Sequence, residues 1–255
     1  MMERNKRYDT LAFCLGILLV GALIQIAGWL KNDRLVFPDV GEILAAFVRL
    51  LGTGKVWKQI GTTLLHLLEA LALSSVIGTA LGLVQGRSPF VRTLLRPLMI
   101  LLRSIPMIVM TVIIMVLAKY EKVPLVATSL MLIPLISEAT CEGFLRIEPE
   151  MIDVYRMNSG FTLRVLFQVY LPLMAGYLKQ AYVNAVGMGI KLAVTTEYLV
   201  QARDSLGKAV YSSAYFNEYA EIYAYALIMI LLAVLVSEVP RWIGKAYSKG
   251  HSYSG

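Results

Sequence analysis

Residues 11–30 read LAFCLGILLVGALIQIAGWL, an apolar run of 20 residues without a charge. An α-helix rises 1.5 Å per residue, so about 20 apolar residues cross the roughly 30 Å of hydrocarbon in a bilayer. Arg4, Lys6 and Arg7 precede the run as in a secretory signal, but the run exceeds a signal core and no small-residue cleavage site follows it. We therefore expect an uncleaved transmembrane helix at 11–30, after a short terminal segment at 1–10.

The composition extends this conclusion to the whole chain. Of 255 residues, 58% are apolar and 16% are charged, and the mean hydropathy is +0.67, whereas soluble domains carry about 25% charged residues. The excess of 24 Lys+Arg over 17 Asp+Glu sets orientation in a membrane protein and does not indicate nucleic-acid binding. Cys14 and Cys141 are too few for a disulfide framework. These features predict an all-α integral membrane protein surrounded by lipid.

About six spans are expected. Those after 11–30 lie at 60–84, 98–118, 123 to about 137, 173–198 and 222–237. Residues 31–58 are expected to form an outside loop with an interfacial amphipathic helix. Residues 59–240 are expected to form the core, in which the polar segment 138–172 is a large loop. Twelve Lys and Arg residues fall on the side of the termini and eight on the other side. The bias places both termini, the tail 241–255 and the 138–172 loop in the cytoplasm.

Motifs for catalysis are missing from the sequence. Its two histidines are His66 and His251, and neither a zinc-protease motif nor a serine-hydrolase motif occurs. Residues 52–55 read GTGK, but the earlier glycine and the following Ser or Thr of a phosphate-binding loop are lacking. We expect no enzyme activity, no metal site and no bound cofactor, so that any ATP is bound by another chain.

Ionisable residues within the expected spans are more informative, because a charge at mid-bilayer costs roughly 2.5–3.5 kcal/mol and is seldom kept without a function. They are Glu69, Arg103, Lys191 and Glu197. Arg103 lies near the end of its span and reaches the surface easily. With Pro106, it is expected to serve as a gate or in packing.

The expected fifth span carries a small and polar stripe. Its members fall within an arc of about 100° at helical spacing: Gly176, Gln180, Asn184, Gly187, Lys191, Thr195 and Tyr198. Such a stripe lines an aqueous path or packs against another helix. We expect a path bordered by Gln180, Asn184, Lys191, Thr195 and Glu197. Lys191 and Glu197 lie about 120° apart around the helix, so each is expected to pair with another segment.

The 138–172 loop contains a predicted exposed helix. Pro149 lies near its first turn with Glu148 and Glu150, which favours a helix N-terminus, and a stop follows at residues 158–160.

These residues resemble the cytoplasmic signature of bacterial ABC importer permeases, E-A-A-x3-G-x9-I-x-L-P. The matching positions hold Asp153-Val154-Tyr155, Ser159, Val169 and Leu171-Pro172. Tyr155 and Ser159 depart from the signature, and Gly160 stands one position late. The resemblance implies that an ATPase subunit grips Glu150, Asp153, Val154, Tyr155, Arg156, Ser159 and Gly160 as a coupling helix between spans four and five.

Further segments, over about residues 36–240, resemble the branch that imports sulfonates, taurine, nitrate or thiamine precursors. They are Phe37-Pro38, residues 102–106, residues 140–143, residues 196–199 and Ser205-Leu206-Gly207. The resemblance implies a type I ABC importer fold in the bacterial inner membrane. It also implies a second permease copy, expected to form a homodimer, an extracytoplasmic solute-binding protein, and ATP with Mg on a partner ATPase. An ion-coupled secondary transporter or a channel without an ATPase remains the alternative.

Overall fold

The computed structural model describes residues 38–147 and 165–251, with side chains described as far as Ser237 except that of Phe167. This part of the chain is helical throughout. Its elements are α2 (Val40–Leu51), α3 (Gly54–Arg87), α4 (Pro89–Ser104), α5 (Met107–Leu117), η1 (Tyr120–Lys122), α6 (Val123–Leu145), the π-helical turn η2 (Leu166–Tyr170), α9 (Leu171–Leu173), α10 (Ala175–Val200), α11 (Leu206–Tyr215) and α12 (Tyr219–His251).

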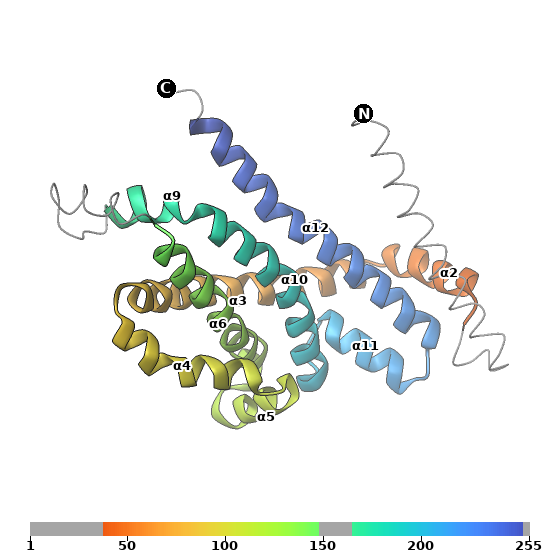
Figure 1. Cartoon of the computed structure of the whole chain (residues 1–255). Helices are drawn as coiled ribbons and strands as arrows, with labels where there is room; N and C mark the ends of the chain where they lie inside the picture. The colour runs from red at the N-terminus through yellow and green to blue at the C-terminus, as the bar shows by residue number, and fades with distance from the viewer. Residues whose placement is uncertain (1–37, 148–164, 252–255) are drawn as a thin grey trace.

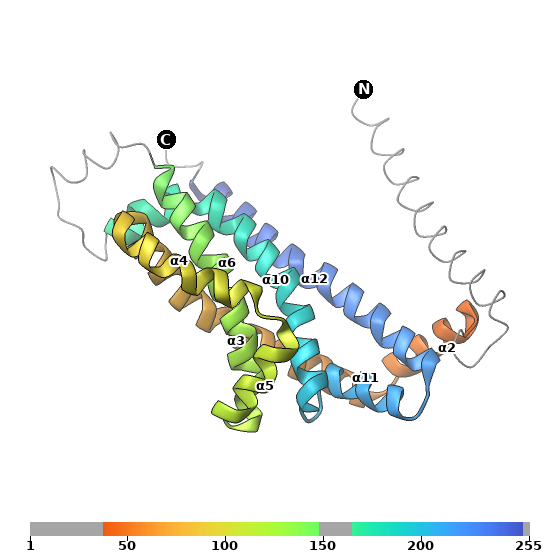
Figure 2. The ribbon, with the colours of Figure 1, turned by 60° about the horizontal axis from the view of Figure 1, so that its bottom comes forward.

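The long helices α3, α6, α10 and α12 run along the molecule, and most of the short elements lie at one of its two ends, whereas α5 lies at the bottom of both views (Figure 1, Figure 2). At one end, called here the α11 end, lie α2, α11 and the start of α12. At the other, the α9 end, lie α9, the end of α6 and the start of α4. The chain therefore alternates between two ends, as expected of a bundle that crosses a membrane several times.

Three of the described helices are long and apolar enough to span a bilayer, namely α3, α6 together with η1, and the Tyr219–Ser237 part of α12; the bent pair α4 and α5 makes a possible fourth. The run at 11–30 lies outside the described residues. α10 has 26 residues but carries Lys179, Lys191 and Glu197. The number of six spans therefore stays a prediction.

Glycines allow α3 and α6 to pack closely. Gly78, Gly82 and Gly86 recur every fourth residue on one face of α3. A β-carbon on Gly82 would collide with the backbone oxygen of Ser137, and one on Gly86 would lie 2.8 Å from the ring of Phe144. Beside this contact a core forms between α3, α6 and α10 around Leu67, Leu132 and Ile190. Small residues thus let the two helix backbones approach closely. This matters in a bilayer because apolar side chains contact lipid about as favourably as they contact another helix.

The expected third span, 98–118, is not a straight helix. α4 ends at Ser104, and α5 begins after Pro106 with its axis turned by 104°. Proline lacks a backbone N–H and pushes the residue before it into an extended conformation, and Ile105 has φ −68° and ψ 124°. The prediction of one continuous span is therefore corrected to two helices joined at a break.

Two expected loops contain helix. α6 continues to Leu145, so the first part of the 138–172 loop is helical, and α11 occupies much of the connection before the last span. α12 runs to His251, so much of the expected tail 241–255 is helical. The expected amphipathic helix within 31–58 is present as α2, which begins with a capping box between Asp39 and Glu42 and buries Ile43, Ala46 and Leu50. Its position at the membrane interface stays a prediction.

Candidate functional site

The polar stripe of α10 lies on the face that turns away from the rest of the protomer. Gln180, Asn184, Lys191 and Thr195 are exposed, whereas the opposite face buries small side chains such as Ala185 and Ala193 against the bundle. The amide of Gln180 donates to Asn184 Oδ1 at 3.2 Å, and the Thr195 hydroxyl donates to the Lys191 carbonyl at 2.7 Å. Among the described side chains, none forms an ion pair with Lys191.

An open groove of about 580 Å³ adjoins this stripe. α10 contributes Tyr177, Gln180 and Asn184, and α6 contributes Glu138 and Glu142. The groove therefore carries amide dipoles on one wall and carboxylates on the other. The rest of its lining is largely apolar and includes Leu135, Ala139 and Ala181, so the groove offers a few polar groups on an apolar surface.

Glu197 lies elsewhere. Its side chain is fully buried, on the side of α10 that faces α3 and α11. Oε2 accepts hydrogen bonds from the Thr63 hydroxyl at 2.8 Å and from the Gly207 N–H at 3.2 Å. Oε1 lies 2.7 Å from Nδ1 of His66. Glu197 is therefore not among the exposed residues of the stripe, and it pairs with other segments, as its spacing from Lys191 predicted.

The same group of residues, called here the Glu197 cluster (Thr63, His66, Glu197, Leu206 and Gly207), joins three helices. Thr63 also accepts from the Leu206 N–H at 3.0 Å, so its hydroxyl bridges α11 to the carboxyl. A β-carbon on Gly207 would lie 2.5 Å from the Tyr198 nitrogen and 2.6 Å from the Val194 oxygen. The backbone of α11 therefore rests directly on α10, and only glycine fits at this contact.

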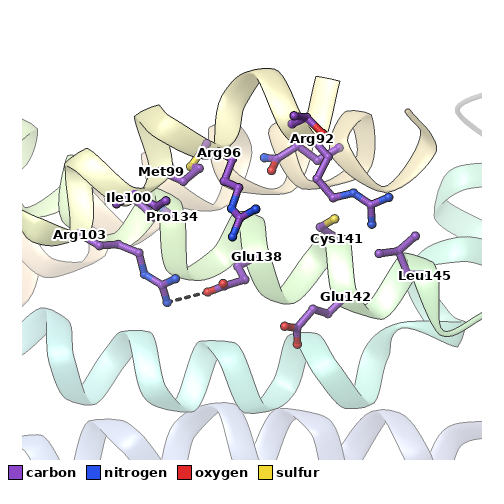
Figure 3. Close-up of a pocket in the computed structure, with 12 residues that line it drawn as sticks. Arg92, Arg96, Met99, Ile100, Arg103, Pro134, Glu138, Cys141, Glu142 and Leu145 are labelled. Atoms are coloured by element: carbon purple, nitrogen blue, oxygen red, sulfur yellow. Dashed lines mark ion pairs between the residues drawn. The ribbon is translucent and has the colours of Figure 1, made fainter. Parts of the chain in front are cut away.

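Arg103 is paired. Its Nη2 lies 2.6 Å from Oε2 of Glu138 on α6, and the two side chains are 47% and 49% exposed. Figure 3 shows this pair, with Arg92 and Arg96 of α4 pointing toward the same stretch of α6. Pro106 precedes the first residue of α5, at the break described above. Sequence reasoning missed Glu138 because it was assigned to a loop, although Glu138 and Glu142 have the i, i+4 spacing of one helix face.

The expected ATPase-coupling residues Glu150, Asp153, Val154, Tyr155, Arg156, Ser159 and Gly160 lie outside the described residues. The segments that flank them meet. Phe144 at the end of α6 stacks on Tyr170 of η2 with ring centroids 5.4 Å apart, and Ile147 and Met174 complete a small core. The two ends of the connection are therefore held together at the α9 end.

Charged side chains also link segments at the α11 end. Lys58 Nζ lies 2.7 Å from Asp204 Oδ2, and Arg49 Nη2 lies 2.6 Å from Glu221 Oε1. The hydrogen bond and charge of Lys58 lower the pKa of Asp204 below its ordinary 3.8. The charge of Glu221, followed by burial, raises the pKa of Glu218 above 4.5. Within the described ranges, no cluster of three His, Cys, Asp or Glu side chains is placed to hold a metal ion.

Comparisons with protein families and with solved structures both found a match to this chain. Residues 74–250 match the family described as "Binding-protein-dependent transport system inner membrane component". A solved structure titled "Inward facing conformations of the MetNI methionine ABC transporter" superposes with a TM-score of 0.61 at 17% identity, covering 80% of this chain and 96% of that one. At this identity the likeness shows the fold. The curated proteins searched gave no match.

Proposed function

The chain belongs to the family of binding-protein-dependent transport system inner membrane components, and on that premise we propose that its α10 lines the solute path of an ATP-driven importer. The family assigns it as a membrane permease component of an ABC importer, in which a separate subunit hydrolyses ATP. The proposal concerns which face of the permease the solute meets.

One observation carries this proposal, namely the exposure of the polar face of α10. Most large exposed side chains of the bundle are apolar, such as Leu68, Val76, Val116 and Leu235, and these suit lipid or a partner helix. The stripe of Gln180, Asn184, Lys191 and Thr195 instead leaves amide, ammonium and hydroxyl groups exposed. Because such groups are costly against hydrocarbon, we place them on the inner surface between two permease copies. Two copies of this chain, forming a homodimer, would then enclose the path.

The solute proposed is a small sulfonate, taurine-like or nitrate anion, or a thiamine-precursor-like compound. The motifs at residues 102–106 and 196–199 support this range, and Lys191 supplies a cation on the exposed stripe. An extracytoplasmic binding protein would deliver the solute at the α11 end, which the charge bias of the sequence places outside. The termini and the Glu150–Gly160 segment would then lie in the cytoplasm of a bacterium.

The coupling proposal is that the ATPase grips the segment from Glu150 to Gly160. Its support is the signature frame at Asp153, Ser159 and Leu171-Pro172, together with the stack of Phe144 on Tyr170 that fixes both ends of the connection. A lever held in this way would pass motion of the ATPase to α6 and α10.

Replacement of Lys191 by methionine tests the path. We expect the variant to assemble with its ATPase and to change the uptake rate or selectivity, measured in proteoliposomes with labelled taurine, an alkanesulfonate, nitrate and a thiamine precursor. Lys179→Met removes the same charge from the same helix but off the stripe, and is expected to transport as the wild type does. Normal rate and selectivity in Lys191→Met would refute a path at this residue.

Charge reversal at Asp153 tests the coupling segment separately. Asp153→Lys is expected to uncouple ATP hydrolysis from uptake while leaving membrane insertion intact. Arg146→Gln alters charge just before the segment and serves as control. Coupled transport by Asp153→Lys would show that the ATPase docks elsewhere.

A further inference from the structure

α4 is amphipathic, and its charged face borders an open cavity beside α6, in which Arg92 is half-buried and Arg96 and Arg103 are exposed. Arg92, Arg96 and Arg103 fall within about 40° of one another around the helix, and they line a cavity shared with α6. The opposite face carries exposed apolar side chains: Phe90, Leu94, Leu98 and Leu101. A soluble helix would bury its leucines and expose its arginines. This orientation fits a helix with lipid on its outer side and a polar chamber behind it.

The chamber is a cavity of about 520 Å³ between α4 and α6. Figure 3 shows Arg96 reaching toward Glu138, and Arg92 lying over the stretch from Cys141 to Leu145. Glu138 and Glu142 form the acidic part of its lining, and Pro134 and Cys141 lie in the apolar part. The volume is large enough to hold a phosphate group together with some of its substituents.

Charge within the cavity does not balance. Three guanidinium groups face two carboxylates, and Arg103 is already paired with Glu138 at 2.6 Å. Among the side chains described in 38–147 and 165–237, Arg92 and Arg96 have no carboxylate within ion-pair distance. They lie one helical turn apart, where like charges repel. An anion placed between them would remove this repulsion.

The chemistry of the two arginines selects the kind of anion. A guanidinium group is planar and binds phosphate oxygens in a bidentate manner, and two such groups one turn apart can share one phosphate. The cavity also lies toward the α9 end, which the sequence places on the cytoplasmic side. Basic chambers between helices on that side are the kind of site that holds anionic lipid headgroups.

We propose that the cavity between α4 and α6 binds a phosphate group through Arg92 and Arg96. The group comes from the headgroup of an anionic phospholipid or from a phosphate in solution. Glu142 opposes this binding by its charge. The cavity shares Glu138 and Glu142 with the groove beside the α10 stripe, so the two sites are neighbours. Binding of phosphate through Arg92 and Arg96 is nevertheless a separate proposal from the path of the solute.

The test uses the purified full-length protein in detergent and two probes, fluorescent phosphatidylglycerol with phosphatidylcholine as reference, and inorganic phosphate measured by calorimetry. We expect phosphatidylglycerol, inorganic phosphate or both to bind the wild type. Arg92→Gln/Arg96→Gln should weaken that binding by about tenfold or more. Arg146→Gln, at the same end but outside the cavity, should bind as the wild type does, and Glu142→Gln should bind more tightly.

Two further measurements keep the test decisive. Arg92→Lys/Arg96→Lys keeps the charge but loses the planar fork, so it should bind with intermediate affinity, and unfolding temperatures show whether each variant is folded. Binding of phosphatidylglycerol alone identifies a headgroup site, and binding of inorganic phosphate identifies a site open to solution. Failure of both probes to bind the wild type, or equal binding by the folded Arg92→Gln/Arg96→Gln and Arg146→Gln variants, would overturn the proposal.

Discussion

Glu197 of α10 and Glu138 of α6 are both carboxylates within apolar helices, yet their surroundings are opposite. Glu197 has no exposed side-chain surface, and its two oxygens contact Thr63, His66 and Gly207. Glu138 is 49% exposed and holds one partner, Arg103. A buried charge must be met by partners from the protein, whereas an exposed one is also screened by its surroundings. The comparison separates a carboxylate that joins helices from one that borders a cavity.

Removing the Glu197 carboxyl should lower the stability of the protein more than any other substitution considered below. Glu197→Ala leaves the buried Thr63 hydroxyl and Gly207 N–H, and the partly buried His66, beside an empty space, so we expect a loss of about 3–5 kcal/mol in unfolding free energy. Glu197→Gln should restore most of it, because the amide oxygen accepts from Thr63 and Gly207 while its NH₂ donates to His66. Thermal unfolding in detergent measures both. Equal instability of the two variants would mean that the cluster depends on charge.

Gly207→Ala tests the packing part of the same cluster without touching a charge. The new methyl group would meet the Tyr198 nitrogen and the Val194 oxygen at 2.5 and 2.6 Å, so α11 must move away from α10. We expect a destabilisation of about 1–3 kcal/mol, measured by thermal unfolding. Gly187→Ala, where no atom lies within 4 Å in the protomer, is the matched control. Wild-type stability of Gly207→Ala would show that α11 is held more loosely than its contacts indicate.

For the exposed carboxylate, the expected change is small. Glu138→Gln and Arg103→Gln should each alter unfolding free energy by less than about 1 kcal/mol, because solvent-exposed ion pairs contribute little. A double-mutant cycle with both substitutions measures the coupling between the two side chains. A coupling as large as the loss in Glu197→Ala would mean that Glu138 is also buried in the assembled protein.

The Lys58–Asp204 pair outside the spans should give the smallest effect and a defined pH dependence. Because the pKa of Asp204 is lowered in the folded protein, its contribution is full above the ordinary value of 3.8 and is lost as the pH falls through the lowered folded value. Asp204→Asn should therefore differ slightly from the wild type near neutral pH, and the difference should vanish in acid. Unfolding temperatures between pH 7 and 3 test this. A difference that grows on acidification would contradict the pairing.

Local sequence patterns predicted much of the fold. They could not predict contacts between segments that are far apart in the sequence. Apolar runs predicted α3, α6, α10 and α12, and the spacing of polar residues predicted the exposed stripe of α10. The end of α6 was assigned to a loop because Glu138 was expected to need solvent, whereas it lines a cavity with Arg103. The Glu197 cluster joins His66 and Glu197 across 131 positions, and no local periodicity carries that pairing.

The glycine contact between α3 and α6 restricts how the protein moves. A β-carbon at Gly82 would meet the Ser137 oxygen, so sliding α3 along α6 would drive backbone against backbone. We therefore expect α3 and α6 to move together and not to slide past each other. A change of access between the two sides of the membrane would then need hinges elsewhere. We expect one such hinge at the extended residues Ile105 and Pro106, where the chain turns by 104° between α4 and α5.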